Sequence, residues 1–86
     1  MANILTINEQ IAFQMKSRRK EAGLSQSALA AQSIVSLGSL KRFERTGEIS
    51  LASLIRISVV LGYEDDFRRL FVRRNYQSLD EIINEK

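Results

Sequence analysis

The 86-residue chain contains no cysteine, no histidine and no proline. Without Cys and His it forms no disulfides, and it lacks the thiolate and imidazole ligands of ordinary zinc sites. It also lacks Cys nucleophiles, His-assisted nucleophiles and the usual neutral-pH base, so an enzyme would have to rely on carboxylates or lysine alone. The sequence contains no Gly-rich phosphate loop either. We therefore expect a protein with no catalytic activity, no metal and no other cofactor.

Long apolar runs are also absent, and none approaches the roughly 20 residues that a membrane helix requires. Residues 1–3 do not form the basic segment that begins an export signal. We expect a cytoplasmic protein that does not associate with membranes. With 86 residues, 44% of them hydrophobic and 27% charged, the chain is typical of a single globular domain with one core.

Positive charge is concentrated in the first half of the chain. Residues 1–47 hold seven Lys or Arg against three Glu, a balance of +4, whereas residues 48–86 hold six basic against seven acidic residues, a balance of −1. This asymmetry indicates that one end of the molecule faces a polyanion.

Three glycines, at positions 23, 47 and 62, each close a segment whose apolar residues recur at helical spacing. Thr6 and Glu9 are spaced as a capping box, which predicts a first helix over about 7–22 with Ile11, Met15, Arg19 and Ala22 on its inward face. Serines predict the starts of three more helices. These are a short helix from Ser25 to about Ser33, a third from Ser36 to Gly47 and a fourth from Ser50 to Leu61.

The remaining residues predict an all-α protein with a C-terminal extension. Phe67, Leu70 and Phe71 share a spacing that predicts a fifth amphipathic helix, and residues 79–83 predict a short sixth. We expect residues 1–62 to form the core and residues 63–86 a helical extension of the same compact domain.

Two sequence runs carry a family resemblance. Residues 23–30 read Gly-Leu-Ser-Gln-Ser-Ala-Leu-Ala, and residues 40–45 read Leu-Lys-Arg-Phe-Glu-Arg, with Val35 and Ser36 between the two helices. This pattern resembles the Xre-type, phage-repressor-like helix-turn-helix regulators over residues 11–62. The resemblance implies a five-helix repressor-like domain that binds double-stranded DNA as a homodimer. It further implies a sequence-specific transcriptional regulator, most often one that represses its own promoter through a palindromic operator.

Helical geometry separates the two faces of the expected recognition helix. With about 100° per residue, Leu40 and Phe43 define the inward side, and the opposite side carries Gly38, Lys41, Arg42 and Arg45. We assign base reading to Arg42, because a guanidinium can donate to both O6 and N7 of guanine. Lys41 and Arg45 suit phosphate oxygens. The alternative is that these cations serve only solubility, as on any exposed helix face.

Further DNA contacts are expected around the starts of the two helices. Ser39, Gly38 and Leu37 are candidates for base contacts, although Leu37 could instead cover the edge of the core. Ser36 is assigned to phosphate. Gln26 lies at the start of the second helix, where free N–H groups attract a phosphate, and the resemblance implies the same role. The alternative makes Gln26 an ordinary helix-forming residue.

Two features are interpreted as structural. Arg19 lies on the apolar face of the first helix and Glu44 near the inward side of the third, so a partly buried ion pair is expected, and the resemblance implies the same pair. The fourth helix is apolar almost all round, which predicts that the extension or a second subunit covers its far side. We expect the extension to pack on the side that bears Ile57 and Val60.

The C-terminal pattern carries a second resemblance. Asp66 to Phe71 and Ser78 to Ile82 resemble the extension of small Xre regulators encoded beside HipA-like kinase toxins. This implies an alternative function as an antitoxin that sequesters a kinase toxin. Arg42 and Gln26 would matter for operator binding but not for that role.

Overall fold

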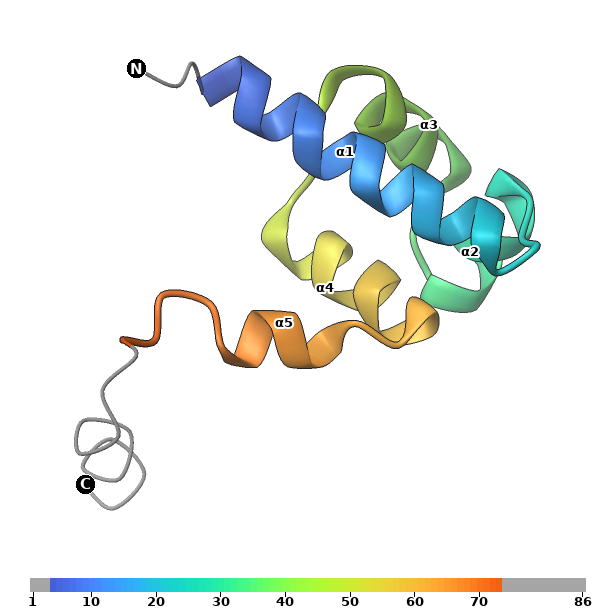
Figure 1. Cartoon of the computed structure of the whole chain (residues 1–86). Helices are drawn as coiled ribbons and strands as arrows, with labels where there is room; N and C mark the ends of the chain where they lie inside the picture. The colour runs from blue at the N-terminus through green and yellow to red at the C-terminus, as the bar shows by residue number, and fades with distance from the viewer. Residues whose placement is uncertain (1–3, 74–86) are drawn as a thin grey trace.

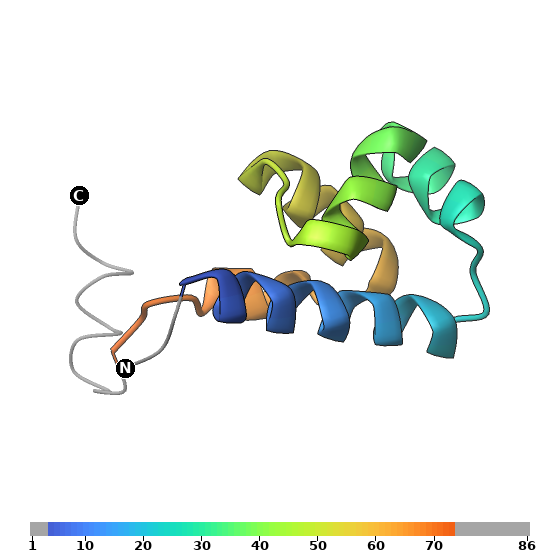
Figure 2. The same cartoon turned by 90° about the horizontal axis from the view of Figure 1, so that it is seen from above.

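The protein is all-α, as predicted. The computed structural model describes residues 4–73, which form no strand. The described residues form five helices: α1 (Ile4–Glu21), α2 (Gln26–Ser33), α3 (Leu37–Thr46), α4 (Leu51–Leu61) and α5 (Glu64–Arg68). Figures 1 and 2 show α1 lying along one side of the group formed by α2, α3 and α4, while α5 follows α4.

Serine side chains begin three of these helices, as predicted. Each accepts a hydrogen bond from the backbone N–H three residues later, which satisfies a donor that has no partner within the helix. The pairs are Ser25 with Ala28 at 3.0 Å, Ser36 with Ser39 at 3.1 Å, and Ser50 with Ser53 at 3.1 Å. Gly47 and Gly62 end α3 and α4 in the left-handed conformation, with φ of 82° and 84°. These local signals therefore located the ends of the helix-turn-helix correctly.

The start and the inward face of α1 differ from the prediction. The helix begins at Ile4, so Thr6 lies within it and cannot act as the cap. Ala12 is only 2% exposed, whereas Ile11 is 42% exposed. Since successive residues are about 100° apart, a helix that packs through Ala12 turns Ile11 to its flank. The small side chain of Ala12 allows α1 to approach the core closely.

The core lies between α1, α2, α3 and α4. Its largest fully buried apolar side chains come from three helices: Phe43 and Leu40 from α3, Leu29 from α2 and Ile57 from α4. Ile57 is fully buried, and both α2 and α5 pack on α4. Residues 74–86 lie outside the described residues, so the expectation that the extension covers the Ile57 side stays a prediction. The turn between α2 and α3 contains Ile34 in the left-handed conformation and the buried Val35.

The extension is less regular than predicted. Helix α5 ends at Arg68, and Phe71 has φ of 64° and is 94% exposed. Leu70 is also exposed. Because the chain turns after α5, Phe67, Leu70 and Phe71 do not form one buried helical face, and that prediction is wrong. The predicted sixth helix, over 79–83, lies outside the described residues.

Gly47 should be the glycine least tolerant of substitution. A Cβ added there would lie 2.8 Å from the backbone of Asn8 in α1, and the left-handed φ adds strain of about 1–2 kcal/mol. Gly62 has the same left-handed conformation, but a Cβ there meets nothing within 4 Å. We expect Gly62→Ala to cost only the strain, and Gly47→Ala to cost about 1–3 kcal/mol more from overpacking. Chemical denaturation of both variants measures their free energies of unfolding. Equal losses of unfolding free energy would contradict the close approach of Gly47 to the backbone of Asn8.

Candidate nucleic-acid interface

The outward face of α3 carries most of the predicted DNA-contacting residues. Leu40 and Phe43 are 1% exposed and anchor the helix on its inner side. The anchored helix leaves five side chains or backbone positions in solvent: Gly38, Ser39, Lys41, Arg42 and Arg45. Three of the five are cationic, so this short helix presents a positive face at the surface.

Gly38 has no packing reason to be a glycine. It lies in the first turn of α3 without a positive φ, and a Cβ added there would find nothing within 4 Å. Glycine within a helix is less favourable than alanine by about 0.5–1 kcal/mol. Contacts within residues 4–73 therefore give no reason for a glycine at this exposed position.

The other residues at the start of α3 take different positions. Leu37 is half-buried and packs against the core cluster, so the structure places it at the core edge. The Ser36 hydroxyl accepts the N–H of Ser39 and donates to the Ser39 Oγ at 2.8 Å. Both serines are exposed, but their hydroxyls are already bonded to each other.

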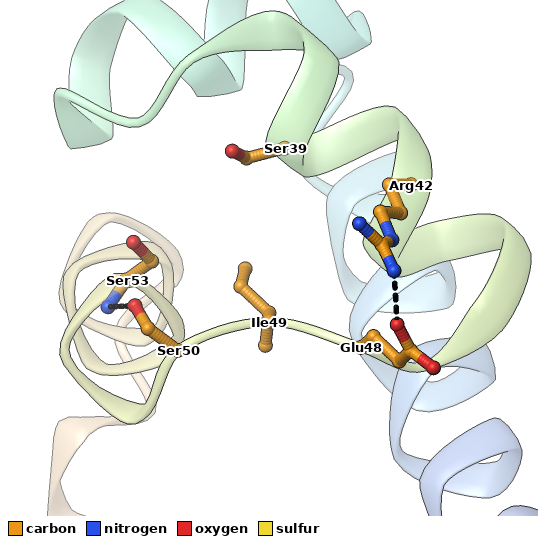
Figure 3. A pocket seen from close by; sticks show the side chains of 6 residues that line it. All are labelled: Ser39, Arg42, Glu48, Ile49, Ser50 and Ser53. Atoms are coloured by element: carbon orange, nitrogen blue, oxygen red, sulfur yellow. Dashed lines mark hydrogen bonds and ion pairs between the residues drawn. The ribbon is translucent and has the colours of Figure 1, made fainter.

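Arg42 is paired with a residue that sequence reasoning did not identify. Its Nη2 donates to Oε1 of Glu48, which follows Gly47 in the connection between α3 and α4. Figure 3 shows the two side chains pointing toward each other at one side of a hollow of about 280 Å³ between α3 and the start of α4. The hollow is lined by Ser39, Arg42, Glu48, Ile49, Ser50 and Ser53.

Arg19 and Glu44 meet in the interior, together with Gln26. Arg19 Nε donates to Glu44 Oε2 at 2.7 Å, and Arg19 Nη2 donates to Glu44 Oε1 at 3.0 Å. Arg19 also donates from Nη1 to the carbonyl of Leu24 at 2.9 Å. Gln26 Nε2 donates to Glu44 Oε1 at 2.9 Å, so this amide contacts the ion pair. The cluster joins α1, α2 and α3.

This geometry agrees with a comparison of the chain with known families. A family model described as helix-turn-helix matches residues 15–67, which is more than half of the chain. The chain belongs to the Xre-like helix-turn-helix family. This is a family of DNA-binding transcription regulators. No curated protein and no solved structure matches the chain.

The family match ends at residue 67, before most of the pattern that resembles antitoxin-type members. Residues 78–82 of that pattern lie outside the described residues, so the antitoxin role stays a hypothesis. Within residues 4–73, no cluster of acidic side chains is arranged to hold a metal ion. No helix in the same range is long and apolar enough to cross a membrane.

The helix-turn-helix depends electrostatically on Glu44. Burial by itself would raise the pKa of this carboxyl, whose side chain is only 4% exposed. Hydrogen bonds from Arg19 and Gln26, together with the charges of Arg19 and Lys16, outweigh burial and lower the pKa of Glu44 below its usual value. The carboxylate is therefore the stable form in the folded chain.

We expect Glu44→Ala to destabilise the helix-turn-helix by about 3–5 kcal/mol, because it leaves the Arg19 guanidinium buried without its partner. The buried pair should also make the free energy of unfolding depend on pH in the acidic range. Since the pKa of Glu44 is lower in the folded chain than in the unfolded chain, its contribution is complete above about pH 4.3 and is lost as the pH falls through the folded value. Urea denaturation between about pH 3 and 7 measures both effects.

The isosteric variant Glu44→Gln is the control for the acid effect, because it has no carboxyl to protonate. The wild-type chain should lose unfolding free energy below about pH 4.3 as Glu44 is protonated. The Glu44→Gln variant should lack this contribution to the loss. A double-mutant cycle with Arg19→Met tests the pair itself. Negligible coupling between the two positions, or identical acid profiles for the unchanged chain and Glu44→Gln, would contradict the structural role.

Proposed function

We propose that the protein is a sequence-specific transcriptional regulator that places α3 in the major groove of double-stranded DNA. The observation that carries this proposal is the exposed face of α3, which holds three cations and a glycine that packing does not require. An α-helix fits the major groove of B-form DNA, and a helix backbone can approach the base edges where Cβ is absent.

Arg42 is the proposed base reader of this face. Its guanidinium has five N–H donors, and the described contact with Glu48 uses one of the two Nη2 hydrogens. The other donors can form a two-bond fork with O6 and N7 of guanine. Ser39 and Gly38 are the proposed secondary base contacts. Leu37 can add only an apolar contact at the edge of the core, where it could meet a thymine methyl.

The proposed phosphate contacts surround Arg42. Lys41 and Arg45 extend from the same exposed face of α3, and Ser36 lies at the start of this helix. Gln26 begins α2, where backbone N–H groups have no helical partner and favour an anion. Because its side-chain amide donates to Glu44, we propose that Gln26 holds phosphate through its backbone N–H and its second amide hydrogen.

We expect Arg42→Ala to weaken binding to the preferred site by about 1–3 kcal/mol and to relax the preference at one base pair. Lys41→Ala should weaken binding to all sequences alike, since phosphates are present in every duplex. The preferred site is obtained by selecting duplexes from a randomised DNA pool. Fluorescence anisotropy at fixed salt, on the selected duplex and on a scrambled duplex, then measures both variants.

Lys41→Ala serves as the matched control, because it removes one positive charge from the same helix face. Equal losses on the selected and scrambled duplexes for Arg42→Ala would contradict the base-reading role. Failure of the unchanged chain to select any sequence would contradict sequence-specific recognition altogether.

A homodimer on a palindromic operator is the second part of the proposal. Leu51, Ile55 and Val59 are spaced by four residues along α4 and are all exposed. Such a row of large apolar side chains on one helix face indicates a protein contact. Two copies joined there would each read one half-site, and operators of two-fold proteins repeat the symmetry of the protein. Resemblance to phage-repressor-like regulators supports an operator in the protein's own promoter, where binding would repress transcription.

We expect Val59→Glu to convert the dimer into a monomer, because it places a charge within the apolar row. Sedimentation equilibrium measures the mass. Ile34→Asn is the control, because Ile34 is also a highly exposed isoleucine but lies in the turn before α3, with a positive φ that Asn tolerates. If the wild-type chain is a monomer, or if the Val59→Glu variant remains a dimer, this interface is refuted.

A further inference from the structure

Glu48 is an unexpected residue on a DNA-binding surface. Between residues 22 and 63 the chain has two carboxylates, and the other one, Glu44, is buried against Arg19. Glu48 is therefore the only exposed carboxylate of this stretch, which also carries the exposed cations Lys41, Arg42, Arg45 and Arg56. A negative charge at a surface that approaches phosphates lowers affinity for every DNA sequence.

The turn after α3 holds Glu48 beside Arg42. Thr46 Oγ1 donates to the carbonyl of Arg42 at 2.8 Å and accepts the N–H of Glu48 at 3.1 Å. Gly47 between them takes the left-handed conformation that ends α3. The turn after the helix therefore directs Glu48 back toward the exposed face of α3, where its carboxylate bonds Arg42.

This pair has no substantial role in holding the fold. The Arg42 and Glu48 side chains are 62% and 55% exposed, whereas those of Arg19 and Glu44 are 9% and 4% exposed. Exposed ion pairs contribute little to folding, because water and salt screen them. We therefore look for the role of the Glu48 carboxylate in DNA binding by Arg42 and not in folding.

We propose that Glu48 is a specificity-determining residue that positions Arg42 and makes it discriminate against phosphate. This rests on the proposed base-reading role of Arg42. The carboxylate accepts one Nη2 hydrogen of the guanidinium and leaves the second Nη2 hydrogen, with a neighbouring N–H, for the fork with guanine. Where the base pair that Arg42 meets is not the preferred one, the ligand within its reach is a phosphate, which competes with Glu48 for the guanidinium and is repelled by the Glu48 charge. Glu48 thus weakens random binding more than it weakens binding at a guanine.

Glu48→Gln tests this proposal, because it removes the charge and keeps the shape of the side chain. The full chain is titrated by fluorescence anisotropy into the duplex selected from a randomised pool and into a scrambled duplex of equal composition. We expect Glu48→Gln to tighten scrambled-duplex binding about fivefold and selected-duplex binding by less than about twofold. The ratio of the two affinities should therefore fall by more than about twofold.

Two controls separate positioning from total charge. Asp66→Asn makes the same change in net charge on α5, which packs on α4, and should leave the ratio unchanged. In an Arg42→Ala background, Glu48→Gln should no longer change the ratio, because the residue that Glu48 positions is absent. Thermal unfolding of each variant checks that the fold is intact, as expected for substitutions at exposed positions.

The outcomes distinguish this inference from the proposed function. If Arg42→Ala lowers the ratio and Glu48→Gln does not, Arg42 reads a base without help from Glu48 and the inference is refuted. If Glu48→Gln lowers the ratio equally with and without Arg42, its effect does not pass through Arg42, and the inference again fails. If Arg42→Ala leaves the ratio unchanged, the base-reading role fails and the inference fails with it.

Discussion

The buried pair between Arg19 and Glu44 is the interaction on which the arrangement of the helix-turn-helix depends. It links α1 to α3, and the bond from Gln26 adds the start of α2. A buried charge without its partner costs several kcal/mol, so packings that separate these residues are strongly disfavoured. Leu40 and Phe43 provide apolar burial on the same helix, but hydrophobic contact alone is not directional. The pair therefore fixes the rotation of α3, and with it the side chains that face outward.

The two ion pairs of α3 show how the surroundings determine what an interaction does. Arg19 with Glu44 and Arg42 with Glu48 are similar in chemistry and very different in exposure. The buried pair is shielded from water and its carboxyl has a lowered pKa, which suits a permanent structural contact. The exposed pair is screened and easily exchanged for another ligand. One helix thus carries a scaffold contact on its inner side and a replaceable contact on its outer side.

How much the sequence could predict follows from how local each signal is. Ser25, Ser36 and Ser50 mark helix starts because a cap needs only a hydroxyl and an N–H three residues away. The inward face of α1 is not predictable in this way, because the rotation of α1 about its axis depends on its packing against α3 and α4. That packing buries Ala12 and leaves the larger Ile11 exposed.

The candidate site was predictable in its outline and not in its contacts. The spacing in α3 identified its outward cations, since about 100° per residue is a property of the helix alone. The bond from Gln26 to Glu44 depends on how α2 packs against α3, and the contact of Glu48 depends on the turn at Gly47. Both contacts join residues whose distance in space is set by tertiary structure or by an irregular connection, where periodicity gives no information.

The positions that break local rules share one property. Gly38 is a helix-weakening residue in a helix, Glu48 is a carboxylate beside cations on the face assigned to DNA, and the α4 row places large apolar side chains in water. Within residues 4–73, no packing contact explains Gly38 or the α4 row, and the pair of Glu48 with Arg42 is too exposed to add much stability. Natural sequences violate such rules mainly at functional sites, where a gain in binding offsets the local cost. Each exception is consistent once a second molecule is placed against it. Under the proposals made above, Gly38 would meet a DNA backbone or base edge, Glu48 would bias Arg42 between phosphate and guanine, and the row on α4 would meet a second copy of the chain.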